Sequence, residues 1–197
     1  MIISIARIFN PLLSPVFAFT LLLALIPITT PDRDLRLIYW LISCLFSSGL
    51  IFAYISYLKY KRVIKSTELV DREHRISPLT FAVISYALGY LLLTVLSAPP
   101  IVCGLMFCYV TTGVLVLMIT RRWKISMHTT AIANATMVLV YHWGWPLLPV
   151  LGLIPIVAAA RIKTQRHDLL QVTAGALLGS IMTMLQLYWF GLQSGSS

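Results

Sequence analysis

Three short polar segments, at residues 65–75, 124–128 and 160–171, hold residue types that suit chemistry on a phosphate group. Lysine and arginine supply fixed positive charge and hydrogen-bond donors that match phosphate oxygens. Histidine can act as a nucleophile or as a general acid near neutral pH. The candidates are Lys65, Arg72, Arg75, Ser126, His128, Arg161, His167 and Gln171. Together they predict a phosphate-binding site with two histidines, which is what phosphoryl transfer through a phosphohistidine requires.

Two of the segments end at predicted helix starts. Ser126 precedes an apolar helix, so it is predicted to be the N-cap, beside backbone N–H groups that can bind an anion. His167 and Gln171 are four residues apart at the start of the last helix. They therefore share a face, and Gln171 can accept a hydrogen bond from the His167 ring. Asp168 would point about 100° away on that helix, so it is predicted to be a poor partner for His167.

The spacing of these residues resembles that in the type 2 phosphatidic acid phosphatase superfamily, the lipid phosphate phosphatases related to vanadium haloperoxidases. The family's motifs read Lys-x6-Arg-Pro, Pro-Ser-Gly-His and Ser-Arg-x5-His-x3-Asp. The matching positions are Lys65 and Arg72 for the first motif, Ser126 and His128 for the second, and Arg161, His167 and Gln171 for the third. The resemblance covers a phosphatase-like core at about residues 60–180, and it includes the segment from Val172 to Gly179.

The resemblance implies a role for each candidate. His167 would attack phosphorus, His128 would protonate the leaving lipid oxygen, and Gln171 would take the third catalytic position. The phosphate would be held by Lys65, Arg72, Ser126 and Arg161, with Arg75 as a further candidate. The family needs no metal, so neither a metal nor another cofactor is expected.

The departures from the family's motifs bear on the rate. Gln171 replaces the Asp that orients the nucleophilic histidine, and a glutamine can fix the ring tautomer but cannot stabilise a positive imidazole. In a serine-protease triad the comparable Asp-to-Asn change costs about 10⁴ in rate through the wrong tautomer. Slow, specialised and absent catalysis are therefore all open. The other departures are Glu73, Ile125, Met127 and Ala160.

These residues predict a membrane-embedded lipid phosphate phosphatase, which hydrolyses a phosphomonoester or diphosphate of a polyisoprenyl lipid or a glycerolipid. One alternative is a phosphotransferase on the same fold, which passes the phosphoryl group to an alcohol instead of water. Another is a non-catalytic membrane protein that binds a lipid phosphate, and Gln171 is the argument for it. A transporter or channel is disfavoured, because the charged residues lie at helix ends and none lies mid-span.

The elements that must position these residues are predicted to be transmembrane helices. The chain has 197 residues, of which 59% are hydrophobic and 11% charged, against about 25% charged in soluble domains. About 20 apolar residues span a bilayer, and Pro99, Pro100 and Pro146 break the longer runs. The sequence predicts an all-α polytopic helix bundle, one membrane domain over residues 1–197 with six to seven spans. They are placed at about 9–29, 37–57, 79–97, 100–120, 127–143, 146–160 and 169–190.

The net charge of +9 indicates membrane topology or an anionic substrate rather than nucleic acid. Seven alternating spans place every Lys and Arg except Arg33 and Arg36 on the side of the polar segments. The positive-inside rule then predicts a cell-membrane protein with its site on the cytoplasmic side. Many bacterial members of the resembled family act on the outer face, and here the charge distribution is followed.

Two further patterns concern how the helices insert and pack. The first apolar run is expected to be a span rather than a cleaved signal peptide, because no small-residue cleavage pattern follows it. Gly175 and Gly179 form a small-residue pattern that lets helices approach closely. It predicts tight packing either within the bundle or in a homodimer.

Overall fold

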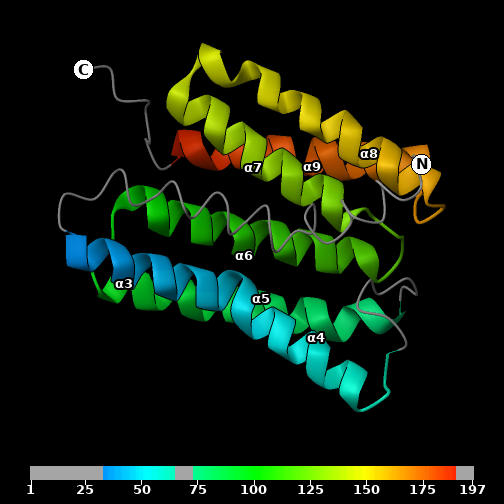
Figure 1. The fold of residues 1–197 in the computed structure, drawn as a ribbon, viewed down its shortest axis with the longest axis horizontal. Helices are drawn as coiled ribbons and strands as arrows, with labels where there is room; N and C mark the ends of the chain where they lie inside the picture. The colour runs from blue at the N-terminus through cyan, green and yellow to red at the C-terminus, as the bar shows by residue number, and fades with distance from the viewer. Residues whose placement is uncertain (1–32, 65–72, 190–197) are drawn as a thin grey trace. The chain divides into compact units, whose positions relative to one another are not determined.

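The computed structural model describes residues 33–64 and 73–189, and every element in these ranges is a helix (Figure 1). No strand occurs in them, so the all-α prediction is confirmed for this part of the chain. The described residues fall into two compact units. We call residues 33–64 and 73–124 the N-terminal unit, and residues 125–189 the C-terminal unit.

The N-terminal unit begins with one continuous helical rod. Its parts are α3 (Arg33–Cys44), the π-helical turn η2 (Leu45–Gly49) and α4 (Leu50–Tyr60). The π turn is absent from the sequence prediction, because its wider hydrogen-bond spacing leaves no apolar signature. A contact from another helix accompanies it: Ser85 Oγ donates to the Phe46 carbonyl oxygen at 2.6 Å.

Helices α5 (Glu73–Val95) and α6 (Pro100–Thr120) form a hairpin after this rod. The hairpin turn lies at the predicted break, with Ser97 in the left-handed region (φ 54°). Pro100 is the first residue of α6, where its missing N–H removes no helical hydrogen bond. Helix α5 begins earlier than the predicted residue 79, because polar residues outside the apolar run also take part in the helix.

The three rods of the N-terminal unit alternate in direction. At one end the Tyr39 hydroxyl donates to the Leu96 carbonyl oxygen at 3.0 Å, and toward the other end the hydroxyls of Tyr54 and Ser77 are 2.6 Å apart. The second end carries most of the unit's basic residues. They are Lys59, Lys61, Arg62, Arg75, Arg121, Arg122 and Lys124.

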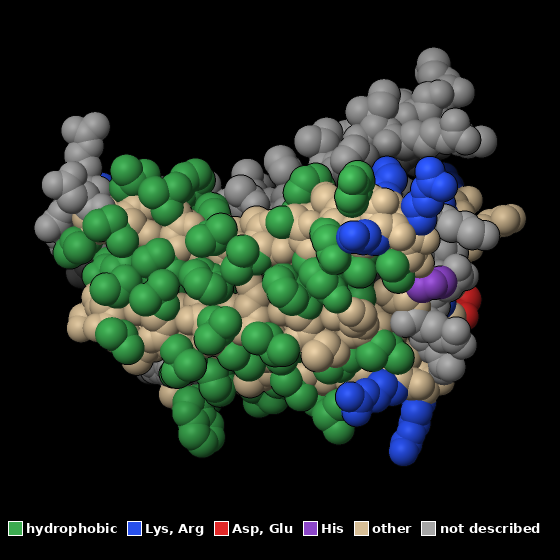
Figure 2. Space-filling model, turned by 90° about the horizontal axis from the view of Figure 1, so that it is seen from below, with side chains coloured by type: hydrophobic (Ala, Val, Ile, Leu, Met, Phe, Trp, Pro, Cys, Tyr) green, Lys and Arg blue, Asp and Glu red, His purple; other side chains and the backbone are tan. Residues whose placement is uncertain are grey.

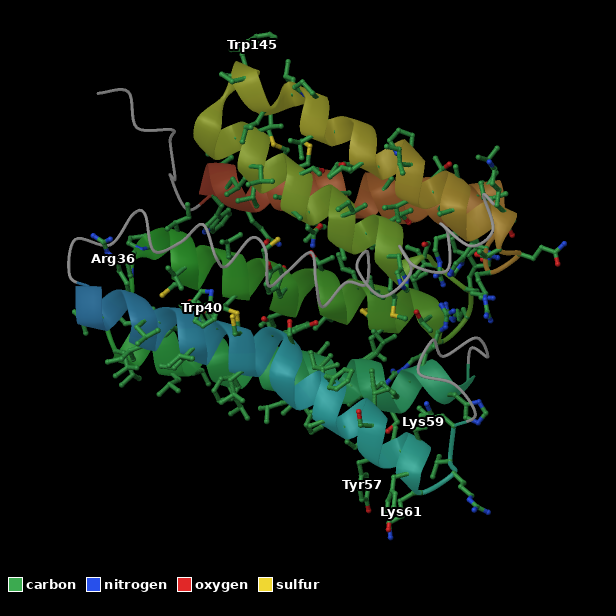
Figure 3. The ribbon with its side chains drawn as sticks, viewed as in Figure 1. Arg36, Trp40, Tyr57, Lys59, Lys61 and Trp145 are labelled. Atoms are coloured by element: carbon green, nitrogen blue, oxygen red, sulfur yellow. The ribbon has the colours of Figure 1, made fainter. Side chains whose placement is uncertain are left out.

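Aromatic and basic side chains lie together at this basic end. Figure 3 shows Tyr57, Lys59 and Lys61 at the end of α4, and Lys61 Nζ is 5.9 Å from the centre of the Tyr57 ring. Arg36 and Trp40 lie on α3, at the start of the same rod. Tyrosines and lysines of this kind are typical of helix ends at a membrane–water interface.

The C-terminal unit holds three helical rods. They are α7 (Met127–Trp143), the 3₁₀-helix η3 (Trp145–Gly152) continued by α8 (Leu153–Lys163), and α9 (Leu169–Trp189). The predicted break after α7 is confirmed, and Gly144 there has a φ of 73°, which favours glycine. The predicted span at 146–160 begins as a 3₁₀-helix, which contains Pro149, a residue that cannot donate an α-helical hydrogen bond.

Helices α7 and α9 run parallel and in close contact. A side-chain Cβ on Gly175 would lie 2.6 Å from the Ser126 carbonyl oxygen, and one on Gly179 would collide with the Thr130 carbonyl oxygen. With its amide nitrogen turned toward oxygen acceptors, Asn134 of α7 donates to the Gly179 carbonyl oxygen at 2.8 Å. The predicted close packing at the two glycines therefore occurs within the chain, between α7 and α9.

Five helices of the described residues are long and apolar enough to cross a membrane, and they indicate a multi-pass membrane protein. They are Leu35–Tyr60, His74–Val95, Pro100–Thr120, Trp145–Lys163 and Leu169–Trp189. Helix α7 has 17 residues and is not among them. The predicted span at 9–29 lies outside the described residues. Five of the predicted six to seven spans are therefore accounted for.

Apolar side chains cover much of the outer surface of these helices, as a bilayer requires. On α9, Leu177, Ile181 and Leu185 share one face and are each more than half exposed. Figure 2 shows hydrophobic side chains along most of the α3–α5 face, with Lys and Arg toward one end. Three exposed aromatics, Trp145, Tyr188 and Trp189, lie where η3 begins and α9 ends.

Candidate active site

Five predicted site residues come together at one end of the C-terminal unit. Helices α7 and α9 both begin there, and α8 ends there. The Ser126 N–H, just before α7, donates to the Gln171 carbonyl oxygen in α9 at 3.3 Å. This backbone bond links the second and third polar segments of the sequence. The five residues are Ser126, His128, Arg161, His167 and Gln171.

The turn between α8 and α9 holds His167 by two local motifs. Gln165 takes a left-handed conformation (φ 53°), and its N–H donates to the Ile162 carbonyl oxygen at 2.9 Å. The Arg161 carbonyl oxygen accepts from the N–H groups of Arg166 at 3.1 Å and His167 at 3.3 Å. The bonds donated by Gln165 and Arg166 together form the Schellman ending of α8. Since α9 begins at Leu169, two residues later, the backbone of His167 is restrained by helices on both sides.

The second motif is a cap at the start of α9. Asp168 immediately precedes the helix, and its Oδ1 accepts from the Gln171 N–H at 2.8 Å. Its Oδ2 accepts from Gln171 Nε2 at 2.7 Å. An acidic residue followed three positions later by glutamine is the spacing of a capping box. Here the glutamine side chain bonds to the cap's side chain.

His167 is 6% exposed, and its Nδ1 lies 2.7 Å from Gln171 Oε1. The hydrogen bond predicted from their four-residue spacing is therefore present. The prediction for Asp168 is wrong in its geometry. Asp168 does not lie on the helix at all but before it, so its side chain reaches forward to Gln171. The result is a continuous chain of hydrogen bonds from His167 through Gln171 to Asp168.

Ser126 caps α7 as predicted. Its Oγ accepts from the Thr129 N–H at 3.4 Å, and its carbonyl oxygen accepts from the hydroxyls of Thr129 and Thr130 at 3.0 Å each. The residue is fully buried. His128 follows in the first turn and is half-buried. The N–H groups of that turn form the positive end of a helix, which is a site suited to an anion.

Arg161 stands in the last turn of α8 and is 3% exposed. A buried guanidinium keeps its charge, because the group cannot be deprotonated in proteins. Burial of that charge is favourable only beside groups that hydrogen-bond to it or neutralise it. Arg161 therefore supplies a lasting positive charge near the backbone of His167.

The first motif is described only in part. Lys65 and Arg72 lie outside the described residues. Arg75 belongs to the N-terminal unit, in the first turn of α5, and is 2% exposed. Neighbouring His74 is exposed. In the two described ranges, no group of three or more His, Cys, Asp and Glu side chains could hold a metal ion.

Asp168 is the residue of this site that the sequence motifs leave out. The signal for it is the Asp-x-x-Gln spacing of residues 168–171 immediately before an apolar run, which marks a helix start. When that start is placed after Asp168, the carboxylate falls within reach of Gln171. Gln171 therefore belongs to two spacings at once: it follows His167 by four residues in the proposed site, and it follows Asp168 by three residues in the helix cap.

Comparison with known proteins adds no relative to this geometry: no protein-family model, no curated protein and no solved structure matches the chain.

Proposed function

We propose that the protein is a membrane-embedded lipid phosphate phosphatase in which His167 forms a phosphohistidine. The observation that carries the proposal is the environment of this ring. It is buried, its Nδ1 is bound to Gln171 Oε1 at 2.7 Å, and it lies between the end of α8 and the start of α9. A proton held on Nδ1 by Gln171 puts the lone pair of a neutral ring on Nε2, the atom proposed to attack phosphorus.

The proposed reaction has two steps that share one general acid–base residue. His167 Nε2 attacks phosphorus, the P–O bond to the lipid breaks, and the lipid oxygen takes a proton from protonated His128. Neutral His128 then takes a proton from water as the water oxygen attacks the phosphohistidine. The P–N bond breaks, His167 is restored, and inorganic phosphate leaves. The sum is one water consumed for each phosphoester bond hydrolysed.

Fixed positive charge would hold the phosphate during both steps. Arg161 and the N-terminal turn of α7 are the described contributors, because each places positive charge at this end of the unit. Lys65, Arg72, Ser126 and Arg75 are proposed as further phosphate ligands. No metal takes part in this proposal.

The substrate is proposed to be a lipid, because the site lies at the end of helices with exposed apolar faces. The chain of a polyisoprenyl lipid or a glycerolipid would lie along such a face, with its phosphate at the end where Arg161 lies. We propose that this end lies in the cytoplasm, following the positive-inside rule. A cysteine that replaces Lys163, which is exposed in the last turn of α8, and is probed with an impermeant reagent tests this; labelling in intact cells would contradict it.

The deciding experiment is phosphate release by the detergent-purified full chain. The panel comprises phosphatidic acid, phosphatidylglycerol phosphate, and short and long polyisoprenyl phosphates and diphosphates, with a chelator and without metal. We expect release that is lost in His167→Ala and kept in His74→Ala, the matched control with an exposed histidine. Release that survives His167→Ala would contradict the phosphohistidine.

The neutral side chain at position 171 favours a second candidate, a protein that binds a lipid phosphate without turnover. A carboxylate in contact with His167 would stabilise a positive ring, whereas an amide cannot. Gln171→Asp separates the candidates. A faster release in Gln171→Asp would show that the glutamine limits an active enzyme. Lipid binding without release, in the wild type and in Gln171→Asp alike, would favour the second candidate. Release only when an alcohol is added would indicate a phosphotransferase.

A further inference from the structure

The Gln171 amide stands between two groups whose hydrogen-bonding roles are limited. An ionised carboxylate only accepts hydrogen bonds, so the contact of 2.7 Å between Asp168 Oδ2 and the side chain of Gln171 must involve the amide nitrogen. The amide oxygen is then turned toward His167 Nδ1, 2.7 Å away. Because that oxygen only accepts, Nδ1 must carry a proton. In a neutral ring the lone pair is then on Nε2.

We propose that Asp168 is a positioning residue, whose carboxylate sets the orientation of the Gln171 amide and thereby the tautomer of His167. The effect on rate rests on the proposed phosphatase function. The tautomer itself is a property of the resting protein and exists with or without turnover. Both carboxylate oxygens of Asp168 accept from Gln171, so Asp168 acts on the ring through that residue.

Orientation, rather than charge, is the main effect expected of Asp168. Its side chain is exposed, and solvent screens the field of an exposed carboxylate. The Gln171 amide, which lies between Asp168 and the His167 ring, carries no net charge. A hydrogen bond, in contrast, acts at contact distance. Whether the Gln171 amide presents its oxygen or its nitrogen to the His167 ring decides which of the two ring tautomers fits.

Asp168→Asn tests orientation while keeping the helix cap. Asparagine is as good an N-cap as aspartate, so its Oδ1 can still accept from the Gln171 N–H. Its Nδ2 is a donor and needs the Gln171 oxygen, which turns the amide nitrogen toward His167. The ring must then accept at Nδ1 and carry its proton on Nε2, the atom that should attack. We expect kcat to fall by up to about 10⁴, the loss that the wrong tautomer causes in a serine-protease triad.

Exchanging the two side-chain types makes the test specific. In the double variant Asp168→Asn/Gln171→Glu, the new amide nitrogen would donate to one oxygen of the new carboxylate, while the other oxygen accepts from His167 Nδ1. In Gln171→Glu alone, two carboxylates face each other and repel. We expect Asp168→Asn to lower kcat in the wild-type background and to raise it in the Gln171→Glu background. If Asp168 serves only as a cap, the effect should be the same in both backgrounds.

A spectroscopic measurement tests the tautomer without turnover. Histidine labelled with ¹⁵N reports which ring nitrogen carries the proton, and His167→Ala identifies the signals of His167 among the four histidines. At alkaline pH, where an imidazole is neutral, we expect the proton on Nδ1 in the wild type. It should move to Nε2 in Asp168→Asn and return to Nδ1 in the double variant.

The two measurements separate failure of this inference from failure of the proposed function. A wild type that releases no phosphate, but whose His167 proton moves as expected, would contradict the phosphatase and support the positioning role. A proton that stays on the same nitrogen in Asp168→Asn would overturn the positioning role, whatever the activity. An equal loss of kcat in the wild-type and Gln171→Glu backgrounds would overturn it as well.

Discussion

Helices α7 and α9 begin at the same end of the C-terminal unit, and each carries a histidine near its cap. At α7 the cap is a buried serine, and His128 follows it inside the helix, half-buried. At α9 the cap is an exposed aspartate, and His167 precedes it in the turn. The His167 ring is oriented through Nδ1 by Gln171, which the cap itself holds. This difference supports His167 as the proposed nucleophile. It supports His128, whose side chain is the more exposed of the two, as the residue that exchanges protons.

The largest effect should come from comparing His167→Ala with His128→Ala. Loss of His167 removes the nucleophile, so no covalent intermediate should form. Loss of His128 removes the general acid, which contributes about 10²–10⁴ in rate, and should slow the formation of an intermediate that still appears. Acid-labile, alkali-stable phosphate on the protein after brief exposure to labelled substrate measures this. Equal labelling of both variants would contradict the assignment.

A smaller effect is expected where α7 and α9 touch. Gly175→Ala and Gly179→Ala would each press a methyl group against backbone oxygens of α7, and overpacking of this kind costs about 1–3 kcal/mol. We expect a lower midpoint of thermal unfolding in detergent. Gly152→Ala is the matched control, because nothing lies within 4 Å of the added methyl. A control that unfolds as early as the two variants would show that the contact itself is not responsible.

The smallest effect concerns the two caps themselves. Ser126→Ala removes the acceptor for the Thr129 N–H and should lower stability by about 1 kcal/mol. Asp168→Ser keeps a capping oxygen, so the stability of α9 should change by only a few tenths of a kcal/mol. The same change removes Asp168 Oδ2, the acceptor of Gln171 Nε2, and should lower kcat. An equal loss of stability in Ser126→Ala and Asp168→Ser would contradict the prediction that only Ser126→Ala removes a capping oxygen.

The helices follow the sequence prediction closely, because their boundaries depend on local features. Apolar runs of membrane length, the prolines after Ser97 and the glycine after Trp143 mark where spans end, and these marks act within a few residues. The π turn before Leu50 carries no such mark. It forms beside the contact between Ser85 and Phe46, which are distant in sequence, so a local pattern cannot reveal it.

The candidate site shows the same limit on a smaller scale. The bond between His167 and Gln171 is predicted from a shared helix face and is present, but His167 lies in the turn before α9, so the helix geometry is not what brings the two side chains together. The role of Asp168 depends on whether the helix begins before or after it, and helix boundaries are the least certain part of a sequence prediction. A shift of the helix start by one residue changes Asp168 from a side chain pointing away into the partner of Gln171. The phosphate ligands at Lys65 and Arg72 stay predictions.

The parallel packing of α7 and α9 has a consequence for biosynthesis. Helix α7 buries Thr130, Asn134 and Thr136, and polar side chains left facing hydrocarbon are unfavourable. Asn134 finds two of its partners, the Gly179 carbonyl oxygen and the Thr183 hydroxyl, on α9, which leaves the ribosome only after α8 has been made. We therefore expect α7 to wait at the translocon or beside a chaperone until α9 arrives, and a nascent chain that stops before α9 to be a substrate for membrane quality control.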